Sequence, residues 1–346
     1  MKPNSKTRIG VIGCGFFAQN HLNAWKSLGP AGVELAAVCD IDPDKAKSAA
    51  SQFDVPAWFA NADEMLTSAD IDMVDIVTQV RSHKVLAEKA INAGIATIVQ
   101  KPFAFDQNEC SELVELAEAK NVFLAVHENF RFQKPNIIVH DLIKSGAIGN
   151  PNWARISFRT GYDIYAGQPY LLDAERFIIT DVGAHVLDLA RVFLGEVKHL
   201  SAELQSRNPN AKGEDTATMV LRHTSGAVSV VECTYESRRR PDPFPETMIE
   251  LEGTTGSIRV KSNLQIELTS RDELSFLEGD VPVLPWAERP WHVVQESVLR
   301  TCEHIRNSFV AGTPADVSGT DNLKTFALCE AAYKAANIKS SVSPDY

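Results

Sequence analysis

The sequence has few features of metal-binding or disulfide-bonded proteins. Its six cysteines include no C-x-x-C pair, and we expect them to be buried free thiols in a reducing compartment. Its nine histidines include no H-x-x-x-H or H-E-x-x-H spacing. Because metal ligands on a helix usually follow such spacings, we predict that the protein has no metal site.

Basic charge and long apolar segments are also scarce. Lys and Arg number 34 against 45 Asp and Glu, a net charge of −11, and residues 238–240 form the only basic run. We interpret that run as a solvated loop and predict no nucleic-acid partner. Since no apolar stretch is long enough to cross a membrane and no leader peptide is visible, we expect a cytoplasmic protein with no membrane partner.

The 346 residues are enough for two domains with separate cores, and the pattern of apolar segments changes along the chain. Over the first 126 residues, short apolar segments with strand composition alternate with helical segments. This alternation predicts an α/β doubly wound parallel sheet of the Rossmann type. Beyond about residue 151, strands follow one another with few helices between them, which predicts an α+β domain with a large, mainly antiparallel open sheet.

A glycine-rich turn near the N-terminus is the most informative feature. Residues 7–12 have strand composition and lead into Gly13-x-Gly15-x-x-Ala18, which opens a helical segment. Gly13 permits a tight turn, Gly15 lets the backbone approach a pyrophosphate, and Ala18 lets the helix pack closely. The helix would also point its positive dipole end at the phosphates. We therefore predict a dinucleotide site rather than a turn that serves packing alone.

An acid ends the next apolar segment and indicates which dinucleotide binds. Asp40 follows residues 33–39, where a carboxylate can accept hydrogen bonds from both hydroxyls of the adenosine ribose. It would repel the 2′-phosphate of NADP, and the next residue, Ile41, supplies no compensating cation. NAD is therefore the predicted cofactor, and Phe16, Phe17 and Ile41 complete the expected contacts of this part of the site.

A lysine follows another buried segment. Lys101 comes at the end of the strand-like residues 96–99 and precedes Pro102. Because the carboxyl ends of parallel strands line the ligand crevice, we expect Lys101 to project toward the nicotinamide. The alternative is an ordinary solvated lysine. The proline suits a tight turn, including one with a cis peptide bond.

Two acids flank a histidine in the second half of the chain. On a helix, Asp181, His185 and Asp188 would lie within about 60° of one another on one face. One carboxylate on each side of the imidazole would orient the ring and increase its basicity. The alternative is a core histidine beside capping residues.

Together these segments resemble the glucose-fructose oxidoreductase, inositol dehydrogenase and MocA (Gfo/Idh/MocA) family of sugar and polyol dehydrogenases. The resemblance covers nearly the whole chain and includes Thr78 with His83, residues 129–132, 145–149 and 317–321. It implies a Rossmann domain over residues 1–126 and a domain for substrate and oligomer contacts over residues 127–312. It also implies that the C-terminal helix of residues 313–346 packs back on the Rossmann domain.

The resemblance also implies roles for individual side chains. Lys101 would orient cofactor and substrate and steady a developing alkoxide, His185 would be the general base, and Asp181 would support both. Thr78, His83 and Gln100 are expected at the cofactor. Six further side chains are candidates for contacts with substrate hydroxyls, with sheet packing or surface exposure as the alternative: Asn129, Arg131, Tyr162, Asp163, Arg176 and His292.

The chain departs from the family pattern in three places. Gln100 stands where the family usually has Glu before the Lys-Pro pair, and Thr78-Gln79-Val80 replaces the usual Thr-Pro-Asn. The segment His127-Glu128-Asn129 is more polar than usual. Its side chains could contact substrate hydroxyls or pack under the cofactor.

The predicted function is NAD-dependent oxidation of a sugar or polyol by a homodimer or homotetramer. The overall resemblance is to members that oxidise pentoses, D-apiose among them, at the anomeric carbon to lactones. An NAD-dependent glycosidase without net redox is one alternative, and a non-catalytic NAD-binding regulator is another. NADH that accumulates with sugar would exclude the glycosidase. Retention of Lys101, Asp181 and His185 argues against a regulator, which needs no positioned base.

Overall fold

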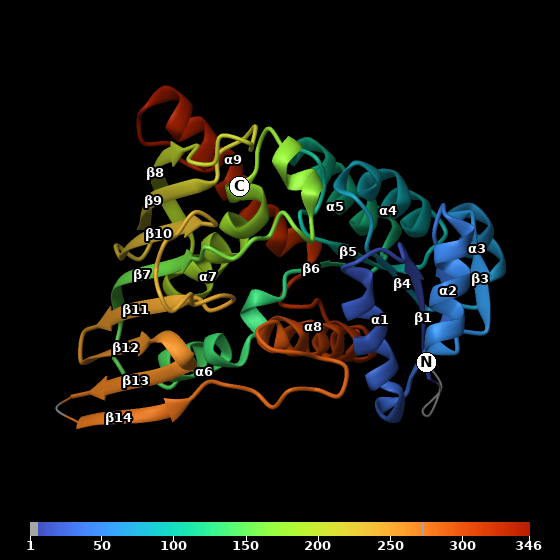
Figure 1. Ribbon diagram of the computed structural model, residues 1–346, viewed down its shortest axis with the longest axis horizontal. Helices are drawn as coiled ribbons and strands as arrows, with labels where there is room; N and C mark the ends of the chain where they lie inside the picture. Colours follow the sequence, from blue (N-terminus) through green and yellow to red (C-terminus); the bar gives the residue numbers. More distant parts are fainter. Residues whose placement is uncertain (1–5, 272) are drawn as a thin grey trace. The chain divides into compact units, whose positions relative to one another are not determined.

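The computed structural model describes residues 6–271 and 273–346, and the chain divides into two compact units. The first unit consists of Met1–Asn129 and Ser297–Leu323, and the second of Phe130–Glu296 and Lys324–Tyr346. Each unit has its own sheet, drawn in Figure 1.

The first unit is a six-stranded parallel sheet with the strand order β3-β2-β1-β4-β5-β6. Its strands are β1 (Thr7–Ile12), β2 (Val33–Cys39), β3 (Ala57–Phe59), β4 (Met73–Ile76), β5 (Ala96–Gln100) and β6 (Leu124–His127). Its helices are α1 (Ala18–Ser27), α2 (Pro43–Phe53), α3 (Ala62–Ser68), α4 (His83–Asn92) and α5 (Gln107–Lys120). Helices lie on both sides of this sheet, α4 and α5 on one and α1 on the other (Figure 1).

The sequence explains both the strands and the starts of the helices in this unit. β4, β5 and β6 are buried at every position, as expected of strands covered on both faces. Asp42 accepts hydrogen bonds at the start of α2, and Asp106 does so at the start of α5, where Glu109 Oε2 accepts from Phe105 N–H (3.0 Å), one residue before the cap. The strand order reverses next to β1, which lies between β2 and β4, and open α/β sheets bind their ligands at such a point.

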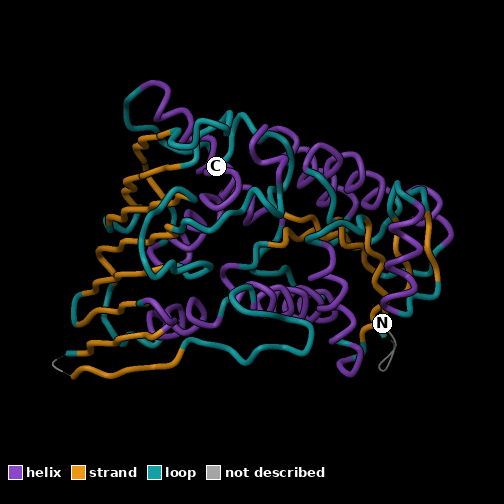
Figure 2. The backbone as a smooth tube through the Cα atoms, viewed as in Figure 1, coloured by secondary structure: helices purple, strands orange, loops and turns teal. Residues whose placement is uncertain are grey.

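The second unit is an eight-stranded sheet with the order β14-β13-β12-β11-β7-β10-β9-β8. Its strands are β7 (Pro151–Arg159), β8 (Val197–Gln205), β9 (Thr216–His223), β10 (Val228–Thr234), β11 (Met248–Gly253), β12 (Gly256–Val260), β13 (Gln265–Ser270) and β14 (Glu273–Glu278). All neighbours pair antiparallel except β7 and β10, which are parallel, so the mainly antiparallel prediction is confirmed. Figure 2 shows these strands as one continuous ladder joined by loops.

One face of this sheet packs on helices of the same unit. α6 (Lys134–Lys144) and α7 (Ala184–Leu194) lie beside it in Figure 1, and α7 is buried at nearly every position. Along β9, buried and exposed residues alternate, as in a strand with one face on the core and one face outward. The remaining helices, α8 (His292–Ala311) and α9 (Gly319–Ile338), each contain residues of both units.

The units divide the chain differently from the predicted domains. Residues 297–312 belong to the first unit rather than the second, and residues 313–346 are shared. Val126 N–H donates to Val317 O (2.8 Å), which ties the segment before α9 to β6. Further along α9, Leu328 and Ala332 are part of the hydrophobic core of the second unit. The C-terminal helix therefore contributes mainly to the second unit.

The structure also contains elements that the sequence patterns did not predict. β3 has only three residues, α6 begins with Lys-Pro after a single 3₁₀ turn, and β14 is exposed at nearly every position. β3 is too short to show an apolar period, whereas α6 has an apolar face: Val139 is buried, and Ile138 and Leu142 pack against the core. The helix assumed for Asp181, His185 and Asp188 is α7 preceded by a π-helical turn over Ile179–Gly183, which changes the angular spacing of these residues.

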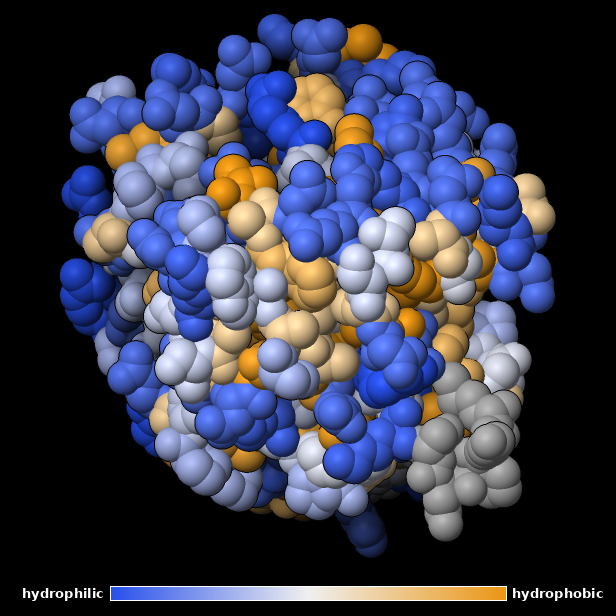
Figure 3. Space-filling model, turned by 90° about the vertical axis from the view of Figure 1, so that its right-hand side faces the viewer, coloured by the Kyte–Doolittle hydropathy of each residue, from blue (hydrophilic) through white to orange (hydrophobic). Residues whose placement is uncertain are grey.

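The surface and the cysteines complete the description. The side shown in Figure 3 is mostly hydrophilic, with apolar side chains gathered near its centre. No helix in residues 6–271 and 273–346 is long and apolar enough to span a membrane. All six cysteines are free and buried, which confirms the prediction of buried free thiols.

Candidate functional site

The glycine turn after β1 has the backbone geometry that a dinucleotide site requires. Gly13 has φ of +101°, and a Cβ there would lie 2.3 Å from Val77 O, so only glycine fits. A Cβ on Gly15 would meet nothing within 4 Å, which leaves space beside the backbone for a ligand. α1 starts at Ala18 with no side chain capping its first N–H groups. These groups can bind phosphate oxygens of NAD.

Asp40 lies directly after β2, as predicted. Its Oδ2 accepts from Cys14 N–H (2.8 Å) and its Oδ1 from Asp42 N–H (2.9 Å), so the carboxylate is fixed between the glycine turn and the start of α2. Each oxygen keeps a lone pair for a ribose hydroxyl. Ile41 beside it is 94% exposed, and Phe16 is 63% exposed, so both can cover a bound nucleotide. These residues fit NAD.

His83, expected at the cofactor, instead connects two loops of the first unit. It is buried, and its ring nitrogens face the carbonyl oxygens of Thr78 (3.0 Å) and Pro102 (2.9 Å). Burial lowers the pKa of His83, and a neutral imidazole can donate to only one of these oxygens. The ring therefore lies between the loop after β4 and the loop after β5 and contacts a carbonyl oxygen of each. A role at the cofactor stays a prediction for Thr78.

Lys101 lies directly after the end of β5. The Lys101–Pro102 peptide bond is cis, as the proline suggested. Gln100 is buried, and its Oε1 accepts from Lys101 N–H (2.6 Å). The side chain of Gln100 thus turns inward and holds the backbone of Lys101 rather than its ammonium group.

In the second unit, a tyrosine binds the predicted catalytic acid. Tyr235 follows β10 and its hydroxyl donates to Asp181 Oδ2 (3.1 Å). Its ring stacks on Phe177 at 5.9 Å, which fixes its orientation. Burial raises the pKa of Tyr235 well above its usual value, so the hydroxyl stays a donor. Sequence reasoning missed Tyr235, because nothing in the local pattern separates it from the core residues of β10.

An aromatic ring packs flat against His185. His185 is 4% exposed and stacks on Phe130 with ring centroids 3.9 Å apart and an interplanar angle of 3°. Phe130 belongs to the segment 129–132 that carried the resemblance, but its role was not predicted. The stack restricts the imidazole to one plane, which directs its nitrogens along that plane.

Asp188 does not have the orienting role that the helix-face argument assigned to it. The buried carboxylate accepts from the guanidinium of Arg131 through both oxygens, and Oδ1 also accepts from Thr325 Oγ1 (2.6 Å). Its ion pair with Arg131 and the π turn before α7 were not visible in the sequence. Arg131, expected to contact substrate, is thus committed to an internal ion pair.

Other predicted substrate residues also have structural partners. Asn129 donates to Ser297 Oγ (2.7 Å), Arg176 pairs with Glu330 (2.7 Å), and His292 Nε2 lies 2.7 Å from Asp280 Oδ1. These contacts explain their positions without a ligand, and they favour the packing alternative.

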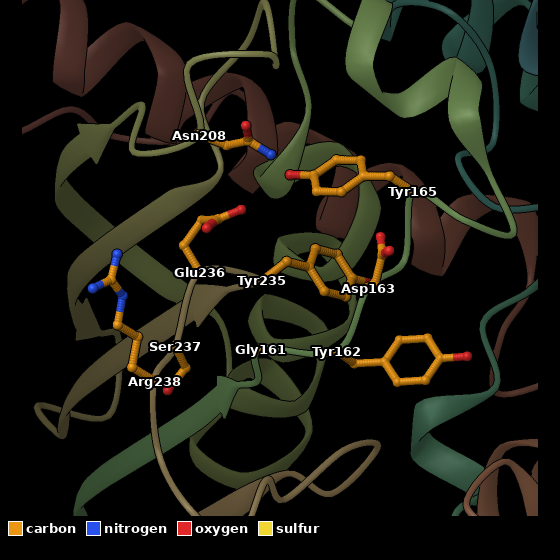
Figure 4. A pocket seen from close by; sticks show the side chains of 9 residues that line it. All are labelled: Gly161, Tyr162, Asp163, Tyr165, Asn208, Tyr235, Glu236, Ser237 and Arg238. Carbon is orange, nitrogen blue, oxygen red and sulfur yellow. The ribbon is translucent and has the colours of Figure 1, made fainter.

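Tyr162 and Asp163 instead line an open cavity of about 310 Å³ in the second unit (Figure 4). The other lining residues are Gly161, Tyr165, Asn208, Tyr235, Glu236, Ser237 and Arg238. In Figure 4 the side chains of Tyr165, Asn208 and Glu236 point toward one another, whereas the Tyr162 ring points away. Burial and the nearby Asp215 raise the pKa of Glu236. Hydroxyl, amide and carboxyl groups of this kind can bind sugar hydroxyls.

One group of residues in the first unit has the composition of a metal site. A ring nitrogen of His21, one of His127 and the Cys302 sulfur lie within 4.8 Å of one another, and all three residues are buried. Both nitrogens of His21 already have partners, however: Nδ1 lies 2.8 Å from Asp75 Oδ2 and Nε2 lies 3.1 Å from Gln100 Nε2. Since His21 has no nitrogen available, the geometry argues against a metal. For His127, it favours packing over substrate contact.

Comparison with known proteins agrees with this description. Residues 7–128 match the family model described as an oxidoreductase family with an NAD-binding Rossmann fold, and residues 138–259 match the GFO/IDH/MocA C-terminal domain. The D-apiose dehydrogenase of Rhizobium rhizogenes is 44% identical over 94% of this chain and 94% of its own length. The myo-inositol 2-dehydrogenase of Thermotoga maritima is 26% identical over 97% and 98%.

Solved structures share the whole fold. A crystal structure of an oxidoreductase from Agrobacterium radiobacter, in complex with NAD⁺, L-tartaric acid and magnesium, is 42% identical and has a TM-score of 0.96. The match covers 98% of both chains. Levoglucosan dehydrogenase in complex with NADH and L-sorbose has the same fold at 22% identity and a TM-score of 0.86. The chain therefore belongs to the Gfo/Idh/MocA family of oxidoreductases, whose N-terminal domain binds NAD in a Rossmann fold.

Proposed function

We propose that the protein oxidises a sugar with NAD, and that D-apiose is its substrate. The observation that carries this proposal is the polar cavity of the second unit, because Tyr235 both lines it and donates to Asp181. The 44% identity to a D-apiose dehydrogenase over nearly the full length of both proteins supports the choice of sugar. Oxidation at the anomeric carbon would give a lactone.

The proposed chemistry assigns one task to each side chain. His185 takes the proton of the reacting hydroxyl, and its stack on Phe130 keeps the ring in one plane. Lys101 stabilises the negative charge that develops on the substrate oxygen, and the bond from its N–H to Gln100 fixes its backbone. Asp181, bonded by Tyr235, supports both groups. NAD, when bound, supplies the hydride acceptor.

We also propose that copies of the chain assemble as a dimer or tetramer through the outward face of the large sheet. Val220 on β9 and Leu274 and Phe276 on β14 are exposed by 44%, 58% and 58%, so apolar side chains lie open near both ends of this sheet. Light scattering of the purified protein would show a single mass of two or four chains. A monomer at micromolar concentration would contradict this assignment.

A substrate panel tests the proposed function. Purified enzyme is mixed with NAD or NADP and with D-apiose, other pentoses, hexoses, polyols or inositols, and reduced cofactor is followed by absorbance. We expect reduction of NAD with D-apiose to exceed that with any other sugar. A cofactor that stays bound while a glycoside is cleaved without net reduction would support the glycosidase alternative and overturn the proposal.

A further inference from the structure

A chain of buried hydrogen bonds in the first unit leads from β4 to the backbone of Lys101. His21 on α1 has Nδ1 2.8 Å from Asp75 Oδ2 and Nε2 3.1 Å from Gln100 Nε2. Gln100 Oε1 in turn accepts from Lys101 N–H (2.6 Å). Asp75 and His21 are fully buried, and Gln100 is 7% exposed.

The bonds determine the proton positions along this chain. Lys101 N–H can only donate, so the oxygen of the Gln100 amide must face it and the NH₂ group must face His21. His21 Nε2 is then an acceptor and carries no proton. The single ring proton lies on Nδ1 and is donated to Asp75. All three hydrogen bonds can therefore form with a neutral His21 imidazole and an ionised Asp75.

Other buried side chains surround the His21–Asp75 pair. Trp25 Nε1 donates to Asp75 Oδ2 (2.7 Å), so this oxygen has both the His21 ring and the indole as hydrogen-bond partners. His127 lies against the His21 ring, with centroids 4.2 Å apart, and burial lowers the pKa of His127 to about 3. Burial also raises the pKa of Cys302 well above its usual value, so its thiol keeps its proton.

We propose that His21 and Asp75 are positioning residues, which act on catalysis by fixing Gln100 and through it the backbone of Lys101. Gln100 is the residue that a neutral His21 requires, since an amide can donate to Nε2 and accept from Lys101 N–H at once. A carboxylate at position 100 has no proton to donate. Its oxygen and His21 Nε2, both acceptors, would then face each other until one of them took up a proton. The proposal rests on the proposed function only in that Lys101 takes part in catalysis.

Nitrogen NMR of the protein labelled with ¹⁵N-histidine tests the proton positions without an activity assay. We expect His21, assigned by comparison with the His21→Asn variant, to carry a single ring proton, on Nδ1. In Gln100→Glu we expect the same ring to gain a proton. A wild-type ring that carries its proton on Nε2, or on both nitrogens, would overturn the proposal whether or not D-apiose is the substrate.

Kinetics then test whether the effect passes through Lys101. His21→Asn keeps a donor for Asp75 but loses the acceptor for Gln100, and we expect kcat/KM to fall about tenfold. In a Lys101→Ala background, measured with enzyme in excess, the same change should alter the rate less than about twofold. Equal losses in both backgrounds would show a merely structural role and contradict the proposal.

A matched control is available in the second unit. His223 is also buried, with Nδ1 2.6 Å from Gly195 O and Nε2 2.9 Å from Ser229 Oγ. His223→Asn removes one bond of a buried imidazole, as His21→Asn does. We expect it to lower the melting temperature but to leave kcat/KM of the folded enzyme within about twofold of wild type.

Discussion

At the scale of single residues, the two glycines of the turn after β1 face different steric limits. Gly13 has a positive φ and no room for a Cβ beside Val77 O, whereas the equivalent position of Gly15 is open. The two glycines therefore have different tasks. Gly13 allows the backbone to turn, and Gly15 leaves space for the ligand.

Alanine substitutions should separate these tasks. Gly13→Ala should lower the free energy of unfolding by more than about 1 kcal/mol, because the new Cβ meets a carbonyl oxygen in a strained conformation. Gly15→Ala should change stability little but should weaken NAD binding. Thermal melts and titration with NAD check both. An equal loss of stability in the two variants would contradict the assignment.

Tyr235 offers a second test at this scale. Tyr235→Phe keeps the stack on Phe177 and removes only the hydroxyl that donates to Asp181. We expect kcat to fall about tenfold, while stability drops by only about 1 kcal/mol. Steady-state kinetics with D-apiose and thermal melts measure the two effects. Unchanged kcat would remove Tyr235 from the proposed site.

Asp40 can be tested through cofactor choice. Asp40→Ser removes the negative charge that would repel a 2′-phosphate while keeping a short polar side chain. We expect the ratio of NAD to NADP affinity to fall about tenfold or more. Fluorescence titration with both reduced cofactors measures the ratio. A wild-type enzyme that prefers NADP would show that Asp40 does not contact the ribose.

At the scale of elements, the segment around α7 shows where sequence periodicity stops being informative. A regular helix would place Asp181 and Asp188 on either side of His185. The π turn over Ile179–Gly183 changes the spacing. Asp181 accepts from Tyr235, and Asp188 pairs with Arg131. Both partners come from distant segments, and such long-range pairs leave no local pattern.

The ion pair of Arg131 and Asp188 predicts a dependence of stability on pH. Burial alone would raise the pKa of Asp188, but Arg131, Arg191 and Thr325 hold it below its usual value. The folded state therefore binds fewer protons, so the pair stabilises the protein above about pH 4 and this contribution is lost as the pH falls further.

Urea unfolding between pH 3 and pH 7 measures this effect. Arg131→Met alone should cost about 3–5 kcal/mol because it leaves Asp188 buried without its main partner. The double variant Arg131→Met, Asp188→Leu should lose less stability and show a weaker dependence on pH below pH 5. A double variant as acid-sensitive as wild type would show that other carboxylates dominate.

At the scale of the whole molecule, the sequence predicts both sheets but not how the chain divides into two units. Alternating strands and helices over the first 126 residues and the change of pattern near residue 151 indicate both sheets. The sequence does not show that α9 joins the second core through Leu328, because its apolar residues surround the helix instead of marking one face.

The most direct test of the central claim is NADH formation from D-apiose by the purified protein. Wild-type enzyme with NAD and D-apiose should accumulate NADH and lactone in equal amounts. Lys101→Ala and His185→Ala should each lower kcat by at least about a hundredfold, with folding unchanged by circular dichroism. Absence of NADH with every sugar of the panel, or full turnover in either variant, would contradict the account.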